Sequence, residues 1–259
     1  MDANEYWPIL SDLKVNGTLQ KFLRIELDAF TTWTENPYPP CMIPLWSTFG
    51  QVIIGYWRHW FAPDSGSYVI YAPESNHIRE IALSVDQVKA YILFNIAGDE
   101  EELDDEFEQA SQLLEYSETD RVADFREQYG FDYEGYLNEY YRDQLPLSAC
   151  ADHSIYNGSL PQPPYNEETV ANFCSYELAP GEMAKVEKKP IWLDRGSVKQ
   201  GFDEAIEAGD LKSAWLSLCS SGWKASEAAE SLTRIADLAG DAILDRYAEG
   251  LLTAFCNDQ

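Results

Sequence analysis

The hydrophobic positions along the chain follow two different spacings, and each spacing predicts a different kind of element. Residues 51–61 are mostly β-branched or aromatic, and residues 67–72 repeat this composition after a polar turn. Runs of this kind are typical of β-strands, and two of them joined by a short loop predict a β-hairpin. From Gly17 to Asn36, by contrast, the apolar residues recur at helical spacing.

Helical spacing returns after the hairpin and continues for about 60 residues. Ser84 is suited to cap a helix over residues 85–96. An apolar stripe then runs through residues 99–114, and two shorter helices are expected over residues 120–130 and 132–142.

The second half of the chain changes character twice. Six prolines interrupt residues 144–196 and exclude a long helix there. From Ser197 the pattern is helical to the end, with breaks at Gly209, at residues 220–222 and at Gly240.

These patterns predict an α+β fold with a small antiparallel sheet flanked by helices, followed by a C-terminal helical bundle or subdomain. Residues 1–145 are expected to form an α+β domain with an acidic helical segment. Residues 146–196 are expected to be an irregular, proline-containing connection, and residues 197–259 a C-terminal helical subdomain. The pattern leaves open whether that subdomain is independent or caps the first domain.

The charge of the chain is concentrated in one stretch. The chain holds 45 acidic and 18 basic residues, a net charge of −27, and residues 99–143 alone hold 17 acidic and three basic ones, a net −14. Binding of phosphates or anionic membranes needs Lys and Arg, so nucleic acid and membrane surfaces are not expected partners. A basic protein is the expected partner, since opposite charge speeds association; a merely solubilising acidic surface is the alternative.

Two sets of side chains in the acidic stretch suit contact with such a partner. Residues 99–108 hold eight carboxylates in ten positions, and residues 132–143 interleave tyrosines with carboxylates. Aromatic rings beside negative charge attract Lys and Arg, although the same mixture also occurs on ordinary helix surfaces. The predicted partner-binding residues are Asp99, Glu100, Glu101, Glu102, Asp104, Asp105, Glu106, Glu108, Tyr133, Glu134, Tyr136, Glu139, Tyr140 and Asp143.

Trp57, His59 and Trp60 form a second conspicuous group. The two tryptophans lie three positions apart, so they face opposite sides of a regular strand. One is expected in the core. The other is either an exposed anchor at an interface or, through a bulge or a covering helix, a core residue as well. We expect His59 to be structural, because a lone histidine in a strand is more often structural than catalytic.

Motifs for catalysis and cofactor binding do not occur in this sequence. GxSxG, HExxH, GxxxxGK[ST] and GxGxxG are all absent, and the EF-hand template starting at Asp99 has Asp104 where glycine is needed. Weak cation binding by the carboxylates stays open. The five cysteines form no CxxC pair, which fits reduced thiols. No signal peptide or apolar span is evident, so we expect a cytoplasmic protein with no enzymatic activity, no cofactor and no metal.

Residues 43–46, 51–61 and 67–72, preceded by a helix and a proline-rich turn, resemble the SMI1/KNR4-like (SUKH) immunity proteins. The likeness covers at most the first 145 residues. It implies an α+β domain that neutralises a toxin used in bacterial competition by occluding the active surface of that toxin. Immunity proteins of this kind are commonly acidic and cytoplasmic, and their toxins are commonly basic.

Two other functions stay open at this point. An acidic DNA mimic or regulatory adaptor shares the charge argument and predicts carboxylates spaced like phosphates. A hydrolase predicts a pocket with at least two carboxylates, which cannot be picked out by sequence among 45 acidic residues.

Overall fold

The computed structural model describes residues 39–48, 52–61, 66–72, 77–97, 105–145, 196–220 and 223–257. The strands are β1 (Met42–Thr48), β2 (Val52–Arg58), β3 (Gly66–Ala72) and β4 (His77–Ala82). The next elements are α5 (Val85–Ile96), α6 (Asp105–Leu114), α7 (Thr119–Tyr129), α8 (Tyr133–Tyr140) and the 3-10 helix η2 (Arg142–Gln144). The last helices are α12 (Val198–Ala208), α13 (Leu211–Leu218), α14 (Ala225–Ala239) and α15 (Ala242–Asn257).

The four strands form one antiparallel sheet in the order β1-β2-β3-β4, so each strand pairs with its neighbours in sequence. The predicted hairpin is confirmed as β2 and β3, which pair Ile54 with Ile70 and Tyr56 with Tyr68. The sequence pattern did not predict β1 or β4 as strands. The predicted α+β class with a small antiparallel sheet and flanking helices is therefore confirmed, while the helix expected over residues 17–36 lies outside the described residues.

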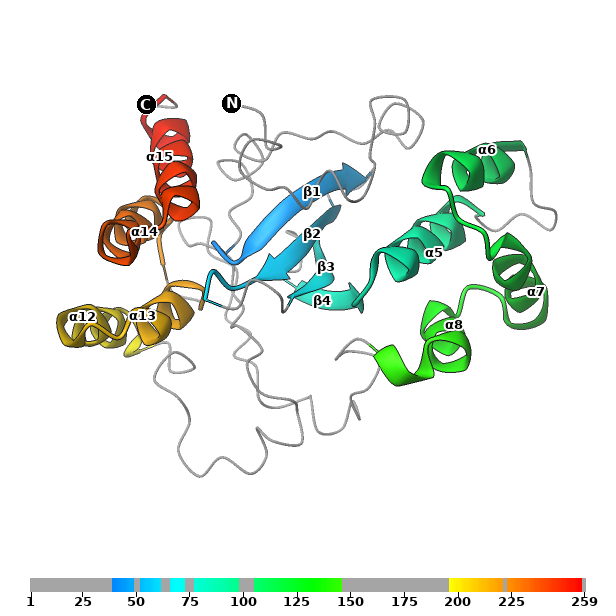
Figure 1. Cartoon of the computed structure of the whole chain (residues 1–259), viewed down its shortest axis with the longest axis horizontal. Helices are drawn as coiled ribbons and strands as arrows, with labels where there is room; N and C mark the ends of the chain where they lie inside the picture. The colour runs from blue at the N-terminus through cyan, green and yellow to red at the C-terminus, as the bar shows by residue number, and fades with distance from the viewer. Residues whose placement is uncertain are drawn as a thin grey trace.

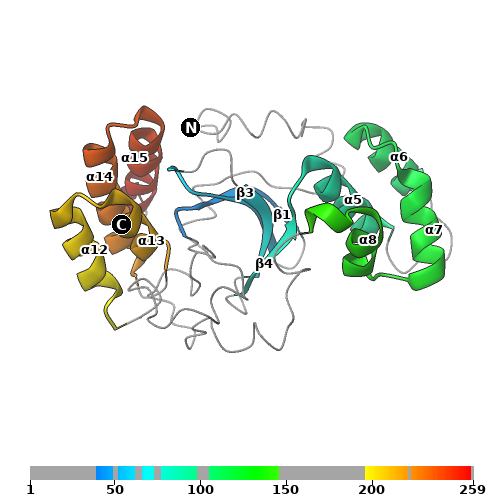
Figure 2. The ribbon, with the colours of Figure 1, turned by 60° about the horizontal axis from the view of Figure 1, so that its bottom comes forward.

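Helices cover both faces of the sheet (Figures 1 and 2). On one face, Ile53, Val69 and Tyr71 share a core with the helices α12–α15, which we call the C-terminal layer. On the other face, Ile54 and Tyr68 share a core with the helices α5–α8, which we call the tyrosine layer. The side chains of a strand alternate between the two faces, so both sets of alternate positions in β2 and β3 are apolar.

Local signals define the ends of several helices. The Ser84 hydroxyl accepts from the backbone N–H of Gln87, and the Gln87 side chain accepts in return from the N–H of Ser84, which confirms the predicted start of α5. Gly209 and Gly240 end α12 and α14 in the left-handed conformation, with φ of 71° and 63°. Glycine adopts this conformation without steric cost, and it closes these helices at the predicted breaks.

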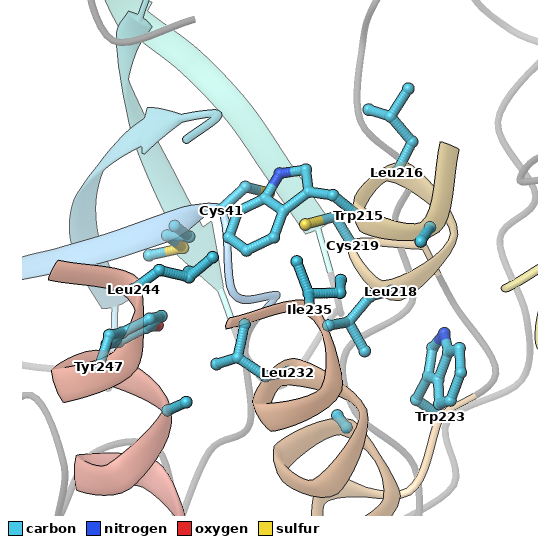
Figure 3. Close-up of a cluster of buried hydrophobic side chains, with 14 of the residues drawn as sticks. Cys41, Trp215, Leu216, Leu218, Cys219, Trp223, Leu232, Ile235, Leu244 and Tyr247 are labelled. Carbon is cyan, nitrogen blue, oxygen red and sulfur yellow. The ribbon is translucent and has the colours of Figure 1, made fainter. Parts of the chain in front are cut away.

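One buried hydrogen bond joins the sheet to the C-terminal layer. The indole N–H of Trp215 on α13 donates to Nδ1 of His59, which directly follows β2, at 2.9 Å. Trp215 is 1% exposed and His59 is 8% exposed, so water does not compete for this bond. His59 also stacks on Phe61 with ring centroids 5.2 Å apart. Figure 3 shows the Trp215 ring between α13 and the sheet, beside Cys41.

The two tryptophans near His59 lie on the same side of the molecule. β2 ends at Arg58, so the chain turns before Trp60 and the alternation of a regular strand no longer applies. Trp57 belongs to the core of the C-terminal layer, and Trp60 packs against that same core. Trp57 is thus the core residue, and Trp60 is partly buried against the same core, between the two alternatives of an exposed anchor and a full core residue.

Replacing Trp215 with phenylalanine removes the indole N–H, so Nδ1 of His59 stays buried but loses this hydrogen-bond donor. We expect the free energy of unfolding, measured by urea denaturation, to fall by about 1–3 kcal/mol more than in Trp60→Phe. Trp60→Phe is a matched control because the indole N–H of Trp60 has no hydrogen-bond partner among the described residues. Equal losses in the two variants would contradict a stabilising role for the hydrogen bond.

Candidate acidic interaction surface

Helix α6 shows how the acidic stretch folds. Asp105, Glu106 and Glu108 are exposed, whereas Phe107 and Ala110 are buried in the core of the tyrosine layer. The apolar stripe predicted for this stretch is therefore present from residue 105 onward, and it fixes the carboxylates on the outer face. Five other predicted contact residues lie outside the described part of the chain: Asp99, Glu100, Glu101, Glu102 and Asp104.

Helix α8 places its tyrosines inward, which corrects part of the sequence prediction. Tyr136 is fully buried, with ring centroids 4.9 Å from Phe94 and 5.5 Å from Phe125. Tyr133 also packs against Phe94, at 5.6 Å. Residues at spacings of three and four lie on one face of a helix, and here Tyr133, Tyr136 and Tyr140 make that face. Tyr136 is therefore a core residue and offers no surface to a partner.

The buried hydroxyls of the tyrosine layer bond to one another. The hydroxyl of Tyr116 lies 3.0 Å from that of Tyr136 and 3.3 Å from that of Tyr141. Tyr133 donates to the backbone carbonyl of Gln87 at 2.8 Å. Burial raises the pKa of Tyr136 to about 12 and also raises the pKa of Tyr116. The hydroxyls therefore stay neutral: those of Tyr116, Tyr136 and Tyr141 join the loop between α6 and α7 to α8 and its C-terminal end, and that of Tyr133 holds α8 against α5.

The carboxylates of the same segment point outward. Glu139 and Asp143 are exposed, and Glu134 and Tyr140 are partly exposed. Residues 105–145 hold twelve acidic and three basic residues, a net charge of −9. One base, Arg121, is paired with Glu118 at 2.7 Å. We call the outer side of α6, α7, α8 and η2 the acidic surface.

The C-terminal layer differs in its balance of charge. Residues 196–220 and 223–257 hold ten acidic and five basic residues, a net charge of −5. Two of its bases bridge helices: Lys199 pairs with Glu227 at 2.6 Å and Arg234 with Asp203 at 2.8 Å. The excess of carboxylates over bases is thus greater in the tyrosine layer.

A pocket of about 240 Å³ opens between β4 and the start of α8. The ion pair between Arg79 and Glu134, at 3.3 Å, is part of its wall. Phe131, which is part of the wall, is 46% exposed, and Tyr129 at the end of α7 is 51% exposed, which is unusual for large hydrophobic side chains. The residues lining the pocket are Arg79, Glu80, Ile81, Phe131, Asp132, Tyr133, Glu134 and Leu137.

Of the pocket residues, the sequence pattern had identified only Tyr133 and Glu134 as candidates. The aromatic pair was missed, although Gly130 between Tyr129 and Phe131 marked the turn. With φ of 70°, this glycine turns the chain sharply at the end of α7 and leaves both neighbours at the surface. Nothing in the sequence pattern pointed to Arg79 as a site residue, because β4 itself was not predicted.

Other chemistry finds little support in the described residues. No group of three or more His, Cys, Asp or Glu side chains within them is arranged to hold a metal ion. His59 is engaged by Trp215, as expected of a structural histidine. None of the described helices combines the length and apolar character that crossing a membrane requires.

The raised pKa of Tyr136 makes stability depend on pH in the alkaline range. A tyrosine whose pKa is higher in the folded protein stabilises the fold fully below its unfolded pKa of about 10. That contribution is lost as the pH rises through the folded value of about 12. We expect the free energy of unfolding to decrease between pH 10 and pH 12, and Tyr136→Phe to flatten this decrease. Tyr129→Phe, on the surface, serves as the control, and an equal effect of both variants would contradict the assignment.

Comparison with known proteins yields no match for this chain among protein-family models, curated proteins or solved structures.

Proposed function

We propose that this chain is a cytoplasmic immunity protein that binds a basic bacterial toxin domain and neutralises it by covering its active surface. The observation that carries the proposal is the arrangement of the tyrosine layer. Most of its aromatic rings face inward, its buried tyrosine hydroxyls bond to one another, and its excess of carboxylates faces outward. An acidic face held on a packed layer is suited to a basic partner, since its charges are fixed before binding.

Electrostatics explains why such a face would suit an inhibitor. A cationic toxin approaching a segment of net charge −9 is attracted over distances of about a Debye length. Attraction of this kind speeds association by about 10- to 1,000-fold and favours partners of opposite charge. Rapid capture matters for a protein that must inhibit a toxin before the toxin acts.

The resemblance to SUKH immunity proteins supports the same proposal. The residues that carry the likeness fall in β1, β2 and β3, which are consecutive strands of one sheet. They therefore form one structural unit rather than scattered matches.

The pocket favours binding over hydrolysis. Its three carboxylates are already engaged: Asp132 accepts from the backbone N–H of Gly135, Glu134 pairs with Arg79, and Glu80 accepts from the hydroxyl of Ser67. A general acid or base needs a carboxyl group that is available to the substrate. The adaptor function predicts the same acidic surface, and the choice of partner in the experiment below separates it from the immunity function.

The test is binding and rescue of growth with the toxin domain encoded beside this chain. Co-expression is expected to restore growth, and the association rate to fall steeply as salt is raised. Reversing three charges on α6, as Asp105→Lys, Glu106→Lys and Glu108→Lys together, is expected to slow association by about 10-fold or more at low salt.

The matched control reverses three exposed charges in the C-terminal layer: Glu207→Lys, Glu230→Lys and Glu249→Lys together. Both triple variants change the net charge equally, so only the position of the charges differs. An affinity that does not change with salt concentration would overturn the role of the acidic surface. An equal slowing of association in the two triple variants would do the same. Failure to bind or rescue would overturn the immunity function itself.

A further inference from the structure

We infer that the pocket between β4 and α8 receives an arginine side chain of the basic partner, which takes the place of Arg79 on Glu134. The inference rests on the proposed function, because it assigns a specific contact within the same acidic surface. It goes further by naming the anchoring side chain, the pocket that holds it and the residue that it displaces.

The size of the pocket suits one side chain. Pockets for drug-sized molecules usually measure about 300–1,000 Å³. At about 240 Å³, this pocket falls below that range but far exceeds the volume needed for a single water molecule. A long side chain of a docked protein is therefore a better occupant than a free metabolite.

The chemistry of the wall suits a guanidinium group, since two wall residues, Glu134 and Phe131, each already contact one. Arg79 places its guanidinium 3.3 Å from the Glu134 carboxylate, and Arg126 lies 4.9 Å from the centre of the Phe131 ring. The charge of Arg79 also acts on the hydroxyls of Tyr91 and Tyr133, where it opposes the rise in pKa that burial causes. A planar cation between a carboxylate and aromatic rings is a favourable arrangement for arginine in particular.

The exchange of one arginine for another costs little. The side chains of Arg79 and Glu134 are 43% and 38% exposed, and ion pairs at such exposure contribute little to stability. Arg79 can then turn into solvent without leaving a buried charge unpaired.

An anion is the less suitable occupant of this pocket. The N-terminus of α8 opens here, and backbone N–H groups at helix starts often bind anions. In this case Asp132 already accepts from the N–H of Gly135 at 2.8 Å, and Glu134 adds a second negative charge in the first turn. Both carboxylates repel an anion and attract a cation.

An exposed aromatic ring in the pocket wall, Phe131, fits an anchoring site, and Tyr129 lies two residues before it in the sequence. Tyr129 and Phe131 leave about half of their surface in solvent, although rings of this size are usually buried. Aromatic side chains and arginine carry much of the binding energy at protein interfaces, where they cluster around a pocket. A partner arginine in the pocket would therefore contact Phe131, an aromatic side chain of the kind that anchors interfaces.

The experiment titrates the full chain with N-acetyl-arginine amide and follows backbone amide chemical shifts by NMR. The neutral analogue N-acetyl-citrulline amide has nearly the same shape and serves as the ligand control. We expect shifts at Arg79, Phe131 and Glu134 at millimolar arginine amide, and none at the same concentration of the citrulline compound. Glu134→Gln is expected to abolish the shifts, whereas Arg79→Ala is expected to tighten binding by about 2- to 5-fold, as removal of an exposed competing ion pair allows.

The pair Arg121–Glu118 provides matched controls, because it is an exposed ion pair on the same layer but away from the pocket. Arg121→Ala and Glu118→Gln make the same charge changes and are expected to leave binding unaltered. If Arg79→Ala disturbs the fold, Arg79→Gln makes the same test with a smaller change. Shifts that survive Glu134→Gln, that appear equally with citrulline, or that weaken in both Arg79 variants would overturn the inference.

Failure of this inference is distinguishable from failure of the proposed function. If the chain binds the toxin domain but shows no arginine-dependent shifts, the proposed function stands and the assignment of this pocket as the anchoring site is wrong. Loss of toxin binding in Glu134→Gln, with Glu118→Gln unaffected, would place the same contact in the complete complex.

Discussion

The structure depends on the burial of both faces of a four-stranded antiparallel sheet. Antiparallel sheets often keep one face in water, and their strands then alternate apolar and polar residues. In β2 and β3 this alternation is absent, because Ile53 faces the C-terminal layer and Ile54 faces the tyrosine layer. A sheet with two apolar faces needs a cover on each side, so the two helical layers follow from the composition of its central strands.

The tyrosine layer resolves an apparent conflict in the sequence. A segment with an excess of nine carboxylates should resist packing, because like charges repel and are costly to bury. The carboxylates avoid burial by occupying only the outer helix faces, while the inner faces carry rings with hydroxyl groups. The hydroxyls of Tyr116, Tyr136 and Tyr141 satisfy one another, so aromatic surface is buried without leaving these groups unpaired. Each helix thus carries its charged residues on the outer face and its packed aromatic residues on the inner face.

Much of this organisation was predictable from local patterns, and the misses have physical causes. The hairpin, α5, α6 beyond its start and the C-terminal helices follow from apolar spacing and caps. β1 was not recognised as a strand because Pro44 interrupts its pattern, and β4 was missed because it is short and carries two charges. Tyr136 was assigned to the surface because charged neighbours dominate its local composition, whereas the three- and four-residue spacing of the tyrosines places it inside. The Arg79–Glu134 pair joins residues 55 positions apart, so no local pattern contains it.

The hydrogen bond between His59 and Trp215 spans 156 residues of sequence. During synthesis the sheet emerges first, and about 130 more residues must follow before α13 can reach it, at a rate of about 5–20 residues per second. For about 7–26 seconds one apolar face of the sheet therefore has no α13 to cover it, and contacts this distant also slow folding. Ribosome-bound chains that have not yet produced α12–α15 therefore leave this apolar face open to aggregation and to chaperones, and the face is fully covered only once α15, the last element of the chain, has been made.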